Sequence, residues 1–273
     1  MRNIIYMKQK IVAAILIILT AALPATILTG YFYSQSVKME YYDCGFSTGI
    51  KIALLSDMHF PRENKNLSSA IDFLKKLSPD IVAVTGDVFD ASATKNDLIK
   101  ADDFYNKLTS FSQVYAVIGN HEIGSPLLTD YIAVCKNNAV NLLLDEFVTL
   151  NLKGKNILIA GVKDGKIPSE KNLPDVTESK LKADASLLLA HRPELIKDYA
   201  YYNFDVVLSG HAHGGQVRLF GRGLYAPDQG FFPKYTSGRY AEGKTQMFVS
   251  RGLGDGKYRL RIFNPYDVLI ITL

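Results

Sequence analysis

The chain of 273 residues contains few of the residues that mark several protein classes: no tryptophan, two cysteines and five histidines. Two cysteines are too few for a small scaffold held together by disulfides. The sequence also has no internal repeat and no low-complexity tract, which argues against a solenoid and against a largely disordered chain. The composition, 48% hydrophobic and 21% charged, is that of a globular protein large enough for one sizeable domain or two small ones.

The net charge of +4 is concentrated near the N-terminus. Residues 1–40 carry four basic residues and one acidic residue, so the rest of the chain has a net charge of only +1. Binding to nucleic acid usually needs a basic surface. We therefore expect no nucleic-acid partner.

A segment without any charged residue lies between Lys10 and Lys38. About 20 apolar residues are enough to cross a bilayer as a helix, and the basic residues before the segment favour a cytoplasmic N-terminus. We expect an uncleaved, single-pass transmembrane helix at residues 1–33, a tyrosine-rich linker at 34–48 and one globular domain at 49–273 on the extracytoplasmic side of the cell membrane. A cleaved signal peptide is the alternative, although no clean cleavage site follows.

Short apolar runs that end in polar, glycine-flanked clusters recur after residue 49. They alternate with helical patterns at 66–77, 95–108 and 127–138, an order typical of α/β units. Residues 147–162 predict a β-hairpin around Gly154. Further strands are expected at 247–252, 258–263 and 267–273, so that two sheets pack together beneath outer helices.

All five histidines follow these expected strands, together with two aspartates and one asparagine. In an α/β sheet, polar residues beyond the carboxyl ends of the strands gather at one site. Nitrogen and oxygen donors without a thiolate favour divalent metals such as Mn, Fe, Zn, Ni or Co. The candidate site residues on this basis are Asp57, His59, Asp87, Asn120, His121, His191, His211 and His213.

Five short motifs occur in the order SDMH, GDVFD, GNHE, AHRP and GHAH. Their order and spacing resemble those of the calcineurin-like metallophosphoesterase superfamily, and the resemblance covers residues 46–273. The part from GHAHGGQVRL onward is similar to the membrane-associated branch, which includes bacterial phosphodiesterases and UDP-diacylglucosamine hydrolases. The resemblance implies a four-layer αββα sandwich, with two mixed β-sheets flanked by helices, and a site for two divalent metal ions, with Mn favoured.

The resemblance also implies a role for each matching residue. His121 would face the substrate phosphate, and Asp90 would hydrogen-bond to His121 and orient it. Asp87 would bridge the two ions. The first ion would be held by Asp57, His59 and His213, and the second by Asn120, His191 and His211.

We therefore expect a membrane-anchored, dinuclear-metal phosphoesterase that cleaves phosphodiester or pyrophosphate bonds through a metal-bridging hydroxide. Its substrate would be a phosphorylated small molecule or a lipid of the cell envelope. A nuclease or nucleotide phosphodiesterase, and a non-catalytic metal-binding module of the envelope, stay open as alternatives. Arg192 and Arg251 could each bind a phosphate, but a structural role is at least as well supported. GLGDGK at 252–257 fails the spacing of a phosphate-binding loop.

Overall fold

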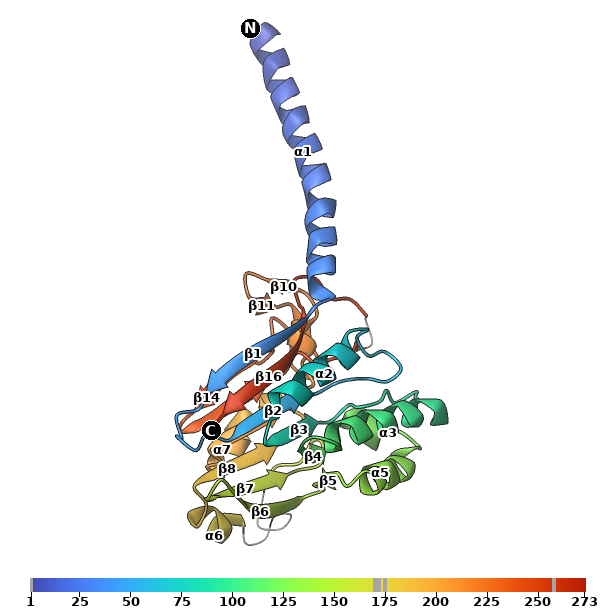
Figure 1. Cartoon of the computed structure of the whole chain (residues 1–273). Coiled ribbons are helices and arrows are strands. Elements are labelled where there is room, and N and C mark those ends of the chain that lie inside the picture. The colour runs from blue at the N-terminus through green and yellow to red at the C-terminus, as the bar shows by residue number, and fades with distance from the viewer. Residues whose placement is uncertain (1, 169–172, 174–175, 257–258) are drawn as a thin grey trace.

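Two six-stranded mixed sheets form the centre of the computed structural model, which describes residues 2–168, 173, 176–256 and 259–273 (Figure 1). In the first sheet, four parallel strands follow one another, and the C-terminal strand is inserted antiparallel beside them. Its strand order is β1 (Val37–Asp43), β16 (Tyr266–Thr272), β2 (Lys51–Leu55), β3 (Ile81–Thr85), β4 (Gln113–Val117) and β5 (Asn141–Leu142).

The second sheet has a parallel centre and an antiparallel hairpin at each edge. The predicted hairpin around Gly154 is confirmed, since Leu152 pairs with Lys155. The strand order is β14 (Gly238–Glu242), β15 (Thr245–Val249), β9 (Val206–Ser209), β8 (Ala185–Leu189), β7 (Lys155–Gly161) and β6 (Glu146–Leu152).

Helices cover the outer face of each sheet, so the predicted four-layer αββα sandwich is confirmed. One buried cluster joins the first sheet to its helices, a second lies between the sheets, and a third joins the second sheet to its helices. The three predicted helices are present, and each presents an apolar stripe to the core. The helices over the first sheet are α2 (Leu67–Leu77), α3 (Lys95–Thr109) and α5 (Leu128–Asn137), and those over the second are α6 (Val176–Leu181) and α7 (Ile196–Tyr201).

Short elements connect the strands around one end of the sandwich. Several of them carry residues of the site described below. They are α4 (Asn120–Ile123), the 3₁₀ helices η1 (Pro193–Leu195) and η2 (His213–Gly215), and the strands β10 (Arg218–Leu219), β11 (Arg222–Gly223), β12 (Tyr225–Ala226) and β13 (Gly230–Phe231).

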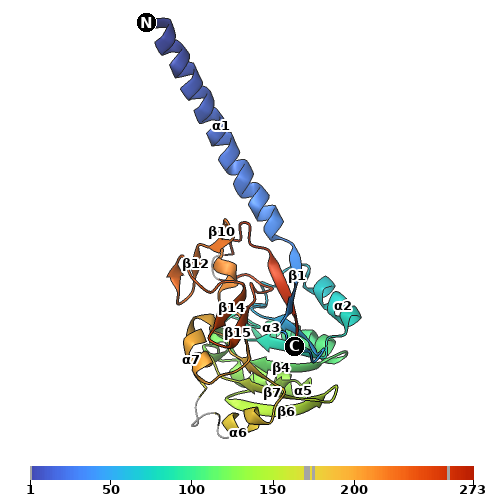
Figure 2. The same ribbon diagram turned by 90° about the vertical axis from the view of Figure 1, so that its left-hand side faces the viewer.

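The N-terminal segment is a long helix, α1 (Arg2–Ser34), which projects away from the sandwich (Figures 1 and 2). The part of the chain that the structure describes contains no helix that combines the length and the apolarity needed to cross a membrane.

Two sequence expectations require correction. Within residues 34–48, which we expected to be a linker, Val37–Asp43 form edge strand β1, because the edge of β16 is free to pair with it in parallel. Residues 259–263, expected to belong to a strand, make only one isolated bridge, between Val217 and Ile262. Residue 258, the first of that expected strand, lies outside the described residues.

Candidate metal centre

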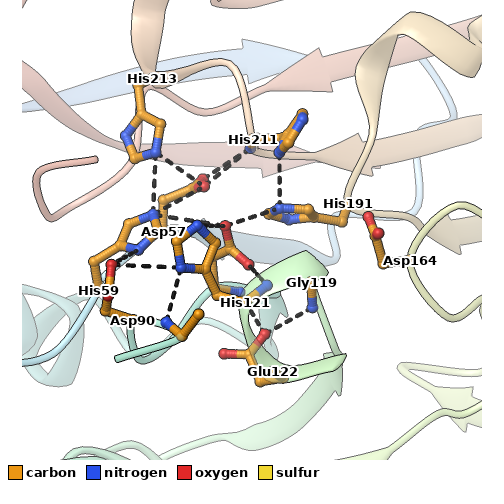
Figure 3. A network of polar contacts seen from close by, with 12 residues as sticks. Asp57, His59, Asp90, Gly119, His121, Glu122, Asp164, His191, His211 and His213 are labelled. Carbon is orange, nitrogen blue, oxygen red and sulfur yellow. Dashed lines mark hydrogen bonds and ion pairs between the residues drawn. The ribbon is translucent and has the colours of Figure 1, made fainter. Parts of the chain in front are cut away.

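The predicted site residues converge beyond the carboxyl ends of β2, β3 and β4 in the first sheet and of β8 and β9 in the second (Figure 3). These strand ends lie at the same end of the sandwich. Loops after these strands carry the side chains toward one another. Six of the predicted metal ligands are at most 4% exposed: Asp57, His59, Asp87, His191, His211 and His213.

The first cluster consists of Asp57, His59 and His213. The Nε2 atoms of His59 and His213 lie 3.1 Å apart. Asp57 Oδ1 lies 3.7 Å from His213 Nε2 and 3.9 Å from His59 Nε2. Burial lowers the pKa of His59 to about 3 and that of His213 well below its usual range. Both imidazoles are therefore neutral at pH 7, which is the form that ligates a metal.

The second cluster is built around His191 and His211, whose Nε2 and Nδ1 atoms lie 3.2 Å apart. The other ring nitrogen of each histidine donates to an acceptor: His191 Nδ1 to the carbonyl of Thr85 at 2.7 Å, and His211 Nε2 to Asp228 at 2.8 Å. A carbonyl and a carboxylate only accept, so they fix the ring tautomers and direct the remaining nitrogens toward each other.

Asp87 lies between the two clusters. Its Oδ2 is 3.2 Å from His191 Nε2 and 3.6 Å from His59 Nε2. Burial lowers the pKa of His191, but the Asp87 carboxylate raises it to about 10 overall. In the absence of a metal, the ring therefore keeps a proton at the place that a cation would take.

Asn120 supplies a further test of whether this site fits a metal. Its Oδ1 is buried and has no hydrogen-bond partner within the described part of the chain, which is unusual for a buried acceptor. Asn120 lines a pocket of about 270 Å³ together with Asp87, His211 and His213. The donor set and this acceptor fit two divalent ions, while the assignment of each residue to one ion stays a prediction.

The backbone at the site is strained. Left-handed φ angles are uncommon for residues with a side chain and persist only where the surroundings hold them. The predicted ligands with φ between 46° and 65° are Asp57, His59, Asp87, His211 and His213.

Glycine is required before His211. A Cβ atom on Gly210 would lie 1.8 Å from Ser56 Oγ and 2.3 Å from Asp57 Oδ2. The glycine of the GHAH motif thus lets the β9 loop approach the first metal cluster, where the backbone N–H of His211 donates to Asp57 at 3.0 Å.

Glu122 holds the loop that carries Asp87, a role that the sequence analysis missed although Glu122 belongs to the GNHE motif. Its Oε1 accepts the backbone N–H groups of Val88 and Phe89 at 2.7 and 3.2 Å. Its Oε2 accepts those of Asp87 and Gly119 at 2.9 and 2.7 Å. Burial and the neighbouring Asp87 charge raise the pKa of Glu122 to about 7.

His121 lies at the edge of the same pocket and is more exposed than the other four histidines. Its Nδ1 accepts the backbone N–H of Ala91 at 2.9 Å, so in the neutral ring the proton is on Nε2. Asp90 was expected to make this hydrogen bond. The structure places Asp90 Oδ2 3.4 Å from the same Nδ1 and 2.8 Å from Arg62, and the orienting role of Asp90 stays a prediction.

Neither arginine that could bind a phosphate is free to do so in this structure. Arg192 forms a bidentate ion pair with Asp164 at 2.7 and 2.8 Å and also contacts Asp228. Arg251 pairs with Glu40 of β1 at 2.6 Å. Asp228, which the sequence analysis did not single out, therefore connects Arg192 to the metal-site histidine His211.

The family comparison agrees with this geometry. Residues 50–215 match the model of the family described as calcineurin-like phosphoesterase. The chain belongs to the calcineurin-like phosphoesterase family. The match includes every predicted metal ligand and His121, from the SDMH motif to the GHAH motif.

Several curated bacterial proteins are similar over most of the chain. An uncharacterized metallophosphoesterase of Campylobacter jejuni is 34% identical over 82% of this chain, which spans only 59% of that relative. A protein of Escherichia coli named phosphodiesterase YaeI is 29% identical, with 82% of each chain covered. Together with the family match, these relatives support a metal-dependent phosphoesterase.

Among solved structures, the protein TT1561 of Thermus thermophilus has a TM-score of 0.50 at 16% identity, covering 76% of this chain and 91% of that one. At this identity the likeness concerns the fold alone.

Proposed function

We propose that this member of the calcineurin-like phosphoesterase family is a dinuclear-metal phosphodiesterase. Its substrate is a phosphorylated lipid or another phosphate ester of the cell envelope, as in the membrane-associated branch that the sequence resembles. The observation that carries the proposal is the position of Asp87 between two histidine clusters, with His121 at the edge of the same pocket.

The residues of the chain divide the chemistry between them. Two divalent ions, of which Mn²⁺ is the first to test, would supply a nucleophile at neutral pH and neutralise charge on the phosphoryl oxygens. His121 Nε2 carries the proton of the neutral ring and borders the pocket, so it can donate to a phosphate oxygen or to the leaving group. The Ala91 N–H fixes this tautomer.

The helix α1 suggests where the enzyme acts. Its side chains Leu23, Ile27, Leu28 and Phe32 are exposed on a helix that projects from the sandwich (Figure 2). We propose that α1 associates with the cell membrane and that the catalytic domain lies on the extracytoplasmic side. This arrangement would place the metal centre near lipid substrates.

The activity can be tested with the full chain, stripped of metal by a chelator and resupplied with Mn²⁺. We expect hydrolysis of bis-p-nitrophenyl phosphate to exceed that of p-nitrophenyl phosphate. His121→Ala should lower kcat by about 10²- to 10⁴-fold while Mn²⁺ binding is retained, because His121 is not a predicted ligand. Bound Mn²⁺ without turnover of either ester would contradict the proposal and favour a binding module.

Membrane association is tested separately by fractionation of cells that produce the chain. Replacing Leu23, Ile27 and Leu28 with glutamine should move the protein from the membrane fraction to the soluble fraction. Leu181→Gln, at an exposed leucine of α6, is the matched control and should change nothing. If the wild type, the triple variant and Leu181→Gln divide equally between the membrane and soluble fractions, a role of α1 in membrane association is refuted.

A further inference from the structure

An apolar groove of about 410 Å³ opens beside the metal centre. This volume is within the range of small-molecule sites. Two of its lining residues, Gln216 and Tyr225, also line the metal-site pocket, so the groove leads directly away from the predicted phosphate position. The residues that line the groove are Gln216, Val217, Leu224, Tyr225, Phe231 and Leu260.

The apolar surface continues beyond the groove. Leu219, Phe220 and Phe232 are exposed, and they line a neighbouring depression that shares Leu224 with the groove. Exposed apolar side chains that gather in one region mark interaction sites more often than single exposed ones do. The segment from β10 to β13 therefore presents a surface suited to an apolar ligand.

This surface lies at the end of the sandwich where α1 emerges (Figures 1 and 2). A chain of contacts connects the two: the Phe263 N–H donates to Gly30 of α1 at 3.0 Å, and Ile262 bridges to Val217 of the groove. The groove thus starts at the metal centre and ends beside the helix that we propose associates with the membrane.

We propose that the groove binds the acyl chain of a lipid phosphodiester whose phosphate lies at the metal centre. The inference rests on the proposed phosphodiesterase activity and specifies its substrate class. None of the described residues that line the groove is charged, so a sugar or a charged head group would lose hydration there without gaining ionic partners. An alkyl chain has no polar group whose hydration would be lost, and burial of its apolar surface in the groove favours binding.

The test uses the full chain with Mn²⁺ and a series of alkyl p-nitrophenyl phosphates, from ethyl to octyl, at concentrations below micelle formation. Burial of a methylene is worth about 0.8 kcal/mol, or about fourfold in affinity. Since the groove is open, we expect about half of this free energy, or about twofold in kcat/KM for each added methylene. The octyl ester has six more methylenes than the ethyl ester, so its kcat/KM should be higher by about 60-fold.

Leu260→Gln should flatten this dependence on chain length. Leu181→Gln replaces an exposed leucine on α6 and is the matched control, for which the dependence should stay as in the wild type. Phenyl p-nitrophenyl phosphate is measured beside the alkyl series. A higher kcat/KM for this phenyl ester than for the hexyl ester would overturn the inference in favour of an aromatic ligand.

The test separates the two proposals. Hydrolysis of the ethyl ester with no rise toward the octyl ester would overturn the acyl-chain groove and leave the phosphodiesterase intact. No metal-dependent hydrolysis of any ester in the series would overturn the proposed function and the inference that rests on it.

Discussion

Replacing Glu122 with glutamine tests whether one buried carboxylate positions the metal-bridging loop. Glutamine has the shape of glutamate, but only one of its two terminal atoms accepts hydrogen bonds. Each oxygen of Glu122 accepts two backbone N–H groups, from Val88 and Phe89 on one side and from Asp87 and Gly119 on the other. Either orientation of the glutamine amide therefore leaves two buried donors facing an NH₂ group.

The expected cost follows from these four bonds. A hydrogen bond to a charged group is worth about 1.5–3 kcal/mol, so the loss of two should lower the free energy of unfolding by about 3 kcal/mol or more. The Asp87 backbone would shift with the released N–H groups. We expect Mn²⁺ affinity to fall by about 10- to 100-fold, as is typical when a group that supports a ligand is removed.

Urea denaturation of the metal-free protein and Mn²⁺ titration, both at pH 8, measure these effects. The pH is chosen because the pKa of Glu122 is about 7, so the carboxylate is ionised. Glu178→Gln, at an exposed ion pair with Lys182, is the control and should cost less than about 0.5 kcal/mol. If Glu122→Gln unfolds at the same urea concentration as the control and binds Mn²⁺ equally well, the positioning role of Glu122 is refuted.

Three further changes test other parts of the structure. Asp87→Asn should lower the bound Mn²⁺ from two ions to one or none, as measured by elemental analysis. It should also lower kcat by more than about 100-fold, which exceeds the usual loss when a group that only supports a metal ligand is removed. Two bound ions in the variant would contradict the bridging position of Asp87. Gly210→Ala should lower the free energy of unfolding by about 3 kcal/mol, measured by urea denaturation, because its Cβ would overlap Ser56 Oγ. Gly221→Ala has open space around it and should cost only about 1–2 kcal/mol for its positive φ. Equal costs would show that the close approach at Gly210 can relax. Burial raises the pKa of Asp267 to about 6, against about 3.9 in an unfolded chain, so the stability that its protonated form contributes below pH 3.9 is lost as the pH rises through 6. When the pH is raised from 5 to 7, the free energy of unfolding of Asp267→Asn should therefore rise by about 1 kcal/mol relative to that of the wild type. A difference between the two proteins that does not change with pH would refute the raised pKa.

The layers and the convergence of the candidate site residues could be predicted from the sequence because both depend on local patterns. Buried parallel strands are continuous apolar runs, such as Ile81–Thr85, and the polar residues of the site follow β2, β3, β4, β8 and β9. The helix α2 buries Leu67, Ala70, Ile71 and Leu74, which is the spacing of one helical face.

Other features depend on partners distant in the sequence. Strand β1 forms by pairing with β16 more than 200 residues later, and its tyrosine-rich sequence did not distinguish an edge strand from a linker. The alternating pattern near residue 260 predicted a strand, yet Arg261 is buried and donates to the carbonyls of Arg251 and Gly254. Glu122 accepts the backbone N–H groups of Asp87, Val88 and Phe89, which lie 33 to 35 residues earlier, so the GNHE motif alone did not indicate its role.

The segment from β12 to β13 joins the metal centre to the proposed lipid groove. Tyr225 and Phe231 line the groove, and Asp228 between them accepts the hydrogen bond from His211 Nε2 that directs Nδ1 of the same ring toward His191. Arg192 holds Asp228 from the other side. Displacement of this segment would therefore also release the tautomer and direction of His211, a predicted metal ligand.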